Sequence, residues 1–397
     1  MPEPVMFSPA EYRALRDMRD RVWQQMAQQD YAGADPFDGL ESRYFAKSPF
    51  VSSRLARLVW LQAMKHAPQM VRNRAGIAPL LNPKTLALLL GAGLGVPVDD
   101  WQTGCVGFDG DVLARDFTRQ LLTLQNEDGG WGYPFAWQAR AFYAGQGQSN
   151  AIVTCFVVDG LMQGGKLPPD HPVLQAAATF LRRELWREQG GATDGGYFAY
   201  IAHSDAEIHN VSLWGAWILH VLCPGNQLSP VALQRILDQQ QEDGSWAYGT
   251  RSHHRFVDGF HTGYILDLLH RFKETGTSPV DVTLAMDRGW RFYRRSCFDD
   301  DGIPRSFAGK AGYLDSHAVA QAMATLHRFG DKAGAAHVAR FAMRELFDAK
   351  RGVFYAGIGR IGRRGRDKRV FMRWTQAWMV WAFSMMLADA PPDAERM

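Results

Sequence analysis

Stretches with helical spacing of apolar residues alternate along the chain with short turns rich in Asp, Gly and an aromatic residue. The turn reads QNEDGGW at 125–131 and QQEDGSW at 240–246, and related turns lie at 194–198, 299–304 and 351–355. Each turn follows one apolar stretch and precedes another, so the repeating unit is a helix, a turn with a variable loop, and a second helix. No strand-like run is long enough for a sheet, and the pattern predicts an all-α protein.

A polar residue opens the second helix of each unit, which gives the repeat an independent register. These openings recur at steps of 60, 51, 54 and 58 residues, at Asn150, Asn210, His261, Asp315 and Arg373. A sixth, weaker unit lies upstream, with helices through Val51–Lys65 and Lys84–Gly95. Six stacked hairpins bury their faces against one another, which predicts an (α/α)6 toroid with one helix of each pair inside and the other outside.

The chain of 397 residues contains no Pro- or Ser-rich linker that would divide it. We expect residues 1–48 to form an N-terminal helix and a loop that covers one mouth of the toroid. Ser8 with Glu11 three residues later predicts the start of that helix. Residues 49–390 are expected to form the toroid domain, and residues 391–397 a frayed tail.

Composition excludes several classes of protein. A net charge of +3 is too small to indicate nucleic-acid binding, and 46% apolar residues argue against disorder. No apolar run reaches the length of about 18 residues that a membrane-spanning helix needs, and the N-terminus lacks a signal-peptide pattern. The four cysteines are isolated in sequence. We therefore expect reduced thiols, a cytoplasmic location and no integral membrane segment.

The segments FTRQLLTLQNEDGGW and LQRILDQQQEDGSW resemble the QW motif of the terpenoid cyclase and protein prenyltransferase superfamily. In that motif a helix ends in Gln and a Gly-x-Trp sequence follows, as Gln125 and Trp131 do here, and Gln240 and Trp246. The other turns are degenerate copies. The resemblance extends over roughly residues 50–390 and implies the toroid fold; it does not imply an activity, because function depends on the site. The turns themselves are expected to be structural.

The chemical motifs of that superfamily are missing. Class II cyclases carry Asp-x-Asp-Asp, whereas the nearest strings here are Asp299-Asp300-Asp301 and Asp109-Gly110-Asp111. Prenyltransferases bind zinc through Asp, Cys and His, but neither Cys155 nor Cys223 has an Asp two residues upstream. We therefore expect no metal and no cofactor, although ligands scattered through the sequence remain an alternative.

The loops before the inner helices, and the first turns of those helices, are expected to converge on the mouth of the toroid. Positively charged and aromatic residues are frequent there. Arg binds carboxylate or phosphate through two parallel hydrogen bonds, and aromatic rings pack on sugars or isoprene units. The residues expected to take part in catalysis are His261, His209, Tyr248 and Asp315. Those expected to bind substrate are Asn150, Asn210, Arg373, Trp137, Tyr143, Arg255, His317 and Trp374.

A structural alternative applies to several of these residues. A polar residue at a helix start is often a cap, which would account for Asn150, Asn210 and Asp315 without any site. His is a poor cap, so His209 and His261 point more strongly to chemistry. Arg373 opens an otherwise apolar helix, where a buried cation needs a partner or a ligand.

The candidate residues together favour a reaction in which a proton is removed from the carbon next to a carboxylate. An Asn with Arg373 would neutralise the substrate carboxylate, His209 or His261 would remove the α-proton, and Tyr200 or Tyr248 would act as acid. This constellation is similar to that of toroidal polyuronate lyases. The expected function is a carbohydrate-active enzyme that acts on an anionic, uronate-containing glycan by lyase- or epimerase-type chemistry.

Three alternatives remain open from the sequence. Glycoside hydrolysis would need two carboxylates, for which Glu207, Asp258 and Asp315 are candidates. An isoprenoid cyclase or prenyltransferase-like enzyme would need Asp315 or Asp258 as the acid and an isoprenoid-type small molecule as substrate. A non-catalytic glycan-binding protein of polysaccharide assembly would keep the aromatic and Arg residues but tolerate loss of His261. The oligomeric state is not readable from the sequence.

Overall fold

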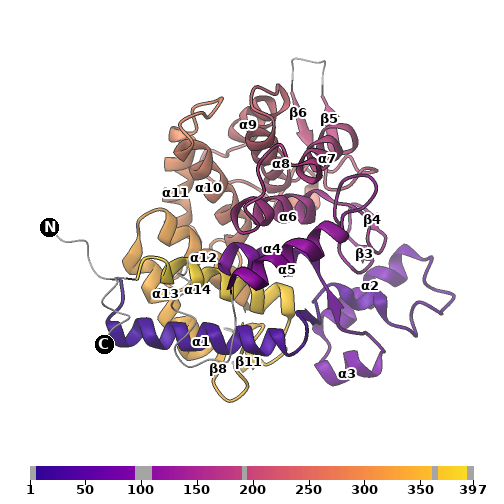
Figure 1. Cartoon of the computed structure of the whole chain (residues 1–397), viewed down its shortest axis with the longest axis vertical. Coiled ribbons are helices and arrows are strands. Elements are labelled where there is room, and N and C mark those ends of the chain that lie inside the picture. The colour runs from indigo at the N-terminus through magenta and orange to yellow at the C-terminus, as the bar shows by residue number, and fades with distance from the viewer. Residues whose placement is uncertain (1–5, 94–109, 190–194, 360–364, 391–397) are drawn as a thin grey trace.

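Six helices form a closed inner ring in the computed structural model, which describes residues 6–93, 110–189, 195–359 and 365–390 (Figure 1). Each inner helix packs against the next, and the last packs against the first. The inner helices are α4 (Pro83–Gly93), α6 (Ala151–Gln163), α8 (His209–Leu222), α10 (Gly259–Glu274), α12 (Ser316–Arg328) and α14 (Trp378–Leu387). Their apolar residues face all directions, as helices enclosed by others require. The predicted (α/α)6 toroid is confirmed.

Six outer helices wrap this ring, each against the inner helix of its own pair. They are α5 (Gly110–Thr123) on α4, α7 (Pro172–Phe180) on α6, α9 (Leu228–Asp238) on α8, α11 (Thr283–Ser296) on α10, α13 (Lys332–Glu345) on α12 and α1 (Pro9–Ala27) on α14. Ser8 caps α1, and Glu11 completes the capping box as expected. The outer partner of the last inner helix is therefore the first helix of the chain.

This pairing differs from the expected sixth hairpin. Helix α4 takes the inner position predicted for Lys84–Gly95, but α2 (Arg54–His66) packs on the 3₁₀ turn η1 (Asp38–Glu41) and on β3 instead of on the ring. Helix α3 (Gln69–Arg74) follows it, and both project beside the ring in Figure 1. We call residues 42–76 the α2–α3 lobe. The expected tail, 391–397, lies outside the described residues.

The strands are short, antiparallel and confined to the connecting segments. The pairs are β1 (Ala32–Gly33) with β2 (Leu80–Leu81), β3 (Trp137–Gln138) with β4 (Tyr143–Ala144), β5 (Trp186–Glu188) with β6 (Gly196–Phe198), and β8 (Phe347–Asp348) with β9 (Val353–Phe354). A three-stranded sheet joins β7 (Leu314–Asp315), β10 (Gly357–Gly359) and β11 (Gly365–Asp367). Single helical turns occur at η3 (Leu181–Leu185), η4 (Ser252–His254) and η5 (Met372–Ala377).

The first QW-like turn joins two hairpins through its side chains. The indole Nε1 of Trp131 donates to the carbonyl of Leu121 at 2.8 Å, at the end of the preceding helix. The amide nitrogen of Gln125 donates to the carbonyls of Gly129 at 2.8 Å and Val173 at 2.9 Å, the latter in the next hairpin. Gly129 has φ of +87°, a conformation that favours glycine. The turn is thus a structural joint.

The second QW-like turn repeats the same bonds. Trp246 donates to the carbonyl of Ile236 at 2.8 Å, and Gln240 donates to Gly244 at 3.0 Å and to Ala285 at 2.8 Å. The sequence likeness of the two turns therefore reflects identical local geometry, and both residues of the motif are committed to holding neighbouring hairpins together.

We predict that Trp131→Ala lowers the free energy of unfolding by about 3–5 kcal/mol, because it removes a fully buried indole and leaves the Leu121 carbonyl without its donor. Urea unfolding followed by circular dichroism measures the loss. Trp290→Ala, at a partly buried indole that stacks on Phe329, is the matched control and should cost clearly less. Equal losses for the two variants would contradict the structural role of the motif.

Candidate active site

A cavity of about 600 Å³ lies where the six inner helices begin. Each helix start contributes to its wall, from Lys84 on α4 to Trp374 on the turn before α14. The largest group of lining residues is aromatic: Phe37, Tyr133, Phe135, Trp137, Tyr200, Tyr248, Phe256, Phe260, Tyr264, Phe307, Tyr313, Phe371 and Trp374. The charged and imidazole groups are fewer: Lys65, His66, Lys84, Asp258, His261, Lys310, Asp315, His317, Arg369 and Arg373. An apolar wall with a few polar groups is typical of a small-molecule site.

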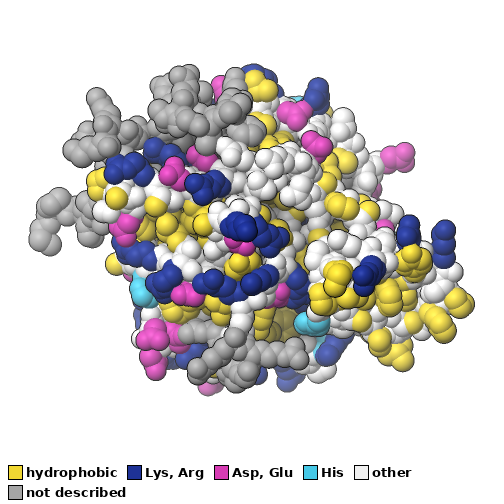
Figure 2. All heavy atoms as spheres, turned by 90° about the horizontal axis from the view of Figure 1, so that it is seen from below, with side chains coloured by type: hydrophobic (Ala, Val, Ile, Leu, Met, Phe, Trp, Pro, Cys, Tyr) yellow, Lys and Arg dark blue, Asp and Glu magenta, His cyan; other side chains and the backbone are white. Residues whose placement is uncertain are grey.

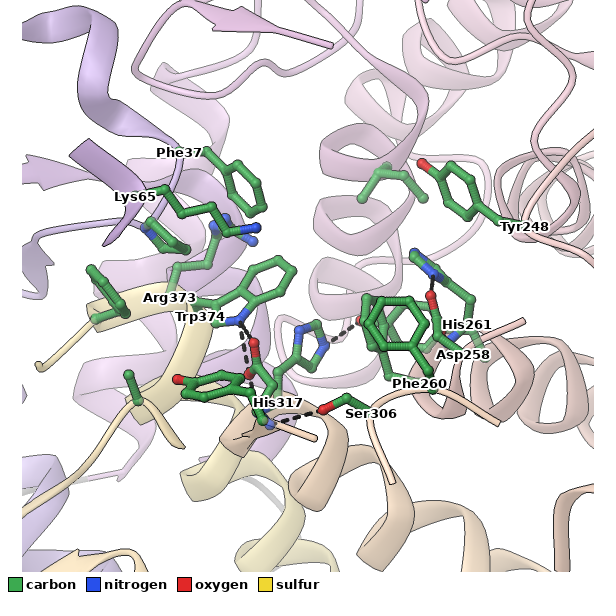
Figure 3. Close-up of a pocket in the computed structure, with 18 of the residues that line it drawn as sticks. Phe37, Lys65, Tyr248, Asp258, Phe260, His261, Ser306, His317, Arg373 and Trp374 are labelled. Atoms are coloured by element: carbon green, nitrogen blue, oxygen red, sulfur yellow. Dashed lines mark hydrogen bonds and ion pairs between the residues drawn. The ribbon is translucent and has the colours of Figure 1, made fainter. Parts of the chain in front are cut away.

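Asp258 and His261 form a pair at the start of α10 (Figure 3). One carboxylate oxygen of Asp258 accepts the backbone N–H of His261 at 2.8 Å, which caps the helix, and the other accepts from Nδ1 of the same residue at 2.6 Å. Because a carboxylate only accepts, Nδ1 carries a proton, and in the neutral imidazole the lone pair is then on Nε2. Within the described part of the chain Nε2 has no hydrogen-bond partner. The pair is therefore arranged as a base facing the cavity.

Asp315 provides an acidic group on another part of the wall. Its carboxyl caps α12 by accepting the backbone N–H of His317 at 2.9 Å, and it accepts the indole N–H of Trp374 at 2.9 and 3.0 Å. Burial raises the pKa of Asp315 to about 6, although these hydrogen bonds oppose the shift. Near neutral pH the side chain can therefore carry a proton or release one.

His317 is held neutral inside an aromatic stack. Its Nε2 lies 2.6 Å from the hydroxyl of Tyr264, and its ring stacks on Phe260 and Trp378 with centroids 4.7 and 4.5 Å apart. Burial lowers the pKa of His317 well below its usual value, and the cation of Lys84 adds to the shift. Burial also raises the pKa of Tyr264, so its hydroxyl donates to Nε2. The buried Nδ1 then carries a proton with no acceptor in the described structure.

Arg373 is committed to a carboxylate of the protein. Its guanidinium donates from two nitrogens to both oxygens of Asp35 at 2.6 and 2.8 Å, and both side chains are buried. It also lies over the ring of Tyr133. Arg369 pairs in the same way with Asp367. Two of the cationic groups of the wall are therefore already neutralised by protein carboxylates.

Lys84 and Lys65 differ, because no carboxylate lies within salt-bridge distance of either amine in the described structure. The Lys84 amine is 3.6 Å from the ring centroid of Phe156 and 5.2 Å from that of Trp378. Burial lowers the pKa of Lys84 well below its usual value and lowers that of Lys65 as well. Both lysines line the cavity. An anionic group on a ligand would supply the partner that the protein does not.

The structure brings most of the expected site residues to this cavity. They are Tyr248, His261, Asp315, Asn210, Arg373, Trp137, His317 and Trp374. Sequence reasoning missed Lys65, Lys84, Phe260 and Tyr264. The signal for Lys84 was present, because LNPKTLALLLGAG has one cation in an apolar helix, as Arg373 has in its own.

Four expected residues lie outside the lining. His209 is buried behind the wall, where its Nδ1 contacts the carbonyl of Ala247 at 2.7 Å. Asn150 caps α6 through the N–H of Val153, which is the structural alternative stated above. Tyr143, in β4, is exposed and its ring lies under the guanidinium of Arg57, and Arg255, directly after η4, is exposed as well.

Glu207 also lies outside, because Arg235 holds it with two bonds of 2.6 and 2.9 Å, which weakens the hydrolase alternative. In the described part of the chain no group of three or more His, Cys, Asp or Glu side chains is placed to hold a metal ion. None of the described helices combines the length and apolar character needed to cross a bilayer.

No family model and no curated protein matches this sequence. Among solved structures, a cellobiose 2-epimerase from Bacillus thermoamylovorans is similar over 77% of this chain and 88% of its own, at 12% identity and a TM-score of 0.55. A possible member of the GH105 family from Salmonella enterica is similar over 77% and 82%, at 12% identity and a TM-score of 0.51. A type II terpene cyclase from Scytonema matches at 14% identity and a TM-score of 0.47, over 77% and 87%. At such identities the likeness to the epimerase and to the GH105 protein establishes the α/α-toroid fold alone.

We predict that Asp315→Asn makes the protein more stable at neutral pH. The folded pKa of about 6 exceeds the unfolded value of 3.8, so the folded state binds more protons and the wild type loses stability as pH rises from about 4 to about 6. The Asn side chain keeps the helix cap but carries no charge. The free energy of unfolding of the variant at pH 7 should therefore exceed that of the wild type by about 1–2 kcal/mol.

Urea unfolding of both proteins from pH 4 to pH 7.5 tests this, and the advantage of the variant should shrink toward pH 4. Asp331→Asn, which exchanges the partly exposed carboxylate cap of α13 in the same way, is the matched control. A variant that is less stable than the wild type at every pH would show that the charge of Asp315 is favourable.

Proposed function

We propose that this chain is an enzyme that abstracts and returns a proton on a small carbohydrate bearing a carboxylate, with epimerase- or lyase-type chemistry. One observation carries the proposal: His261, oriented by Asp258, presents a lone pair to a cavity whose wall also holds the protonatable Asp315. In Figure 3 His261 and Tyr248 lie on one side of the cavity, and Trp374, Arg373 and Lys65 lie on the other.

His261 would act as the general base. Nε2 takes the proton from the carbon next to the carboxylate, and the bonding electrons move toward the carboxyl oxygens. Asp258 stays ionised, keeps the imidazole in the required tautomer and stabilises the imidazolium that forms. This role of a carboxylate behind a histidine needs no proton transfer to the carboxylate itself.

Asp315 or Tyr248 would supply the proton that completes the reaction. If Asp315, which is hydrogen-bonded to Trp374 on the side opposite His261 (Figure 3), returns the proton to the same carbon from the other face, the product is an epimer. If instead the substituent on the next carbon leaves with its bonding electrons and is protonated as it leaves, the product is an unsaturated sugar. Burial keeps the Tyr248 phenol protonated by raising its pKa, and it raises the pKa of Asp315 to about 6.

Lysines of the wall that lack a carboxylate partner in the described structure support an anionic substrate. Lys65 and Lys84 are two of them, and in their protonated form they would stabilise the negative charge that develops on the substrate oxygens. The volume of about 600 Å³ falls within the usual range for small-molecule pockets. It therefore favours a substrate of a few sugar units, with the aromatic rings packing on their apolar faces.

A second candidate function follows from the aromatic lining. An apolar cavity with many rings and a buried, protonatable carboxyl is also the environment that isoprenoid cyclisation requires, and Asp315 would be its acid. Against it stands the pair Asp258–His261, because an imidazole nitrogen facing the cavity would remove a proton from a carbocation and end the reaction early. Protonated lysines in the wall would in addition repel a carbocation. We therefore rank it second.

We predict that the wild-type protein, incubated in D₂O with a panel of uronic acids and short oligouronates, either exchanges the α-proton or forms an unsaturated product that absorbs in the ultraviolet. His261→Asn should lower kcat by about 100- to 10,000-fold, because a general base contributes that much. Ligand affinity should change little, since the imidazole acts mainly on the reacting proton.

His220→Asn is the matched control, because His220 lies on α8 against Trp217 and Phe272 and away from the cavity lining. It should retain activity. Binding of an oligouronate without exchange or elimination would instead indicate a glycan-binding protein. No response to any sugar, with an isoprenoid diphosphate raising the melting temperature, would favour the second candidate.

A further inference from the structure

The α2–α3 lobe carries an unusual share of the exposed apolar surface. Seven of the fourteen large hydrophobic side chains that are exposed in the described structure lie between residues 44 and 71. The most exposed of them are Leu55 at 71%, Phe50 at 64% and Val59 at 61%, and the others are Met70, Tyr44, Val51 and Val71. Figure 2 shows hydrophobic side chains gathered over this lobe, at the right of the view.

Helix α2 has two apolar faces, one buried in the lobe and one exposed. Leu61 and Met64 are buried against η1 and the rest of the lobe, so α2 already has its packed face. Leu55 and Val59 are one helical turn apart on a different face, and no element of the described structure covers them. Exposed apolar side chains that cluster in this way indicate an interaction surface.

The charge of the lobe points to one kind of partner. Residues 42–76 contain seven Lys or Arg and no Asp or Glu, although the whole chain has a net charge of only +3. Arg72 forms a buried ion pair with Asp38. The exposed cations of the lobe include Arg43, Lys47, Arg54 and Arg74, and none of these four has a carboxylate partner in the described structure. A second copy of this chain is a poor occupant, because a two-fold contact would bring these cations together without any acidic group on the lobe.

We propose that the α2–α3 lobe binds the surface of an anionic lipid bilayer. The apolar side chains of Leu55, Val59 and Phe50 enter the boundary between headgroups and acyl chains, and the exposed cations contact the anionic headgroups. Because Lys65 and His66 at the end of α2 line the cavity, docking here brings the cavity mouth to the membrane. The inference rests on the surface alone and does not depend on the proposed function.

Vesicle flotation of the full chain tests the proposal. The protein should float with phosphatidylcholine vesicles that contain phosphatidylglycerol, should float much less with phosphatidylcholine alone, and should be released by added salt. Leu55→Ser with Val59→Ser should lower partitioning about tenfold or more, since both side chains lose apolar area that enters the bilayer. Lys47→Gln with Arg74→Gln should lower it about tenfold on the anionic vesicles.

Matched control pairs keep the result interpretable. Leu124→Ser with Leu284→Ser changes two exposed leucines elsewhere, and Arg182→Gln with Arg183→Gln changes two exposed arginines elsewhere. Both should float like the wild type, and all variants should keep its melting temperature. The proposal is overturned if the wild type does not float, or if it floats equally on neutral vesicles. It is also overturned if the control pairs lose as much vesicle binding as the lobe variants do. It is also overturned if sedimentation velocity shows a dimer that Leu55→Ser with Val59→Ser dissociates.

Discussion

The buried ion pair between Arg373 and Asp35 closes the molecule. It joins the start of the last inner helix to the loop that follows the first outer helix, two segments 338 residues apart. A toroid of hairpins needs one such closure, because its first and last units have no chain connection. Burying both charges costs desolvation energy, so the pair is better understood as fixing which segments meet than as a source of net stability. Losing one partner would leave a buried charge, at a cost of about 3–5 kcal/mol.

The same loop fixes two other parts of the protein. Three residues after Asp35, Asp38 pairs with the buried Arg72 of the α2–α3 lobe, and burial raises the pKa of Asp38 to about 6. Between them Phe37 lines the cavity and packs against Trp374. Residues 35–38 therefore close the ring, attach the lobe and form part of the cavity wall. A substitution at one of these four positions is expected to disturb the other two features as well.

The repeat made much of this architecture predictable. The turns at Trp131 and Trp246 have the same bonds because they have the same sequence, and the polar openings at His261, Asp315 and Arg373 all reach the cavity because each starts an inner helix. The outer position of α1 was not predictable, since it depends on a contact between the two ends of the chain. Asn150 was misplaced for a local reason: its short side chain satisfies a helix N–H, and Ile152 lines the cavity in that unit.

Two of the three histidines that line the cavity, His261 and His317, show how the surroundings of a side chain, more than its residue type, decide its chemistry. His261 has an ionic acceptor behind it and an open nitrogen in front, so protonation of Nε2 during turnover would be stabilised by Asp258. His317 is buried, with a phenol on one nitrogen and Lys84 and Arg373 nearby, so burial and these neighbouring groups oppose a positive charge on it. His261 therefore presents an open ring nitrogen to the cavity, whereas His317 can offer the proton of Nδ1 as a hydrogen-bond donor. The contrast between them arises from their surroundings: a carboxylate three residues upstream for His261, and aromatic and cationic side chains from other parts of the ring for His317.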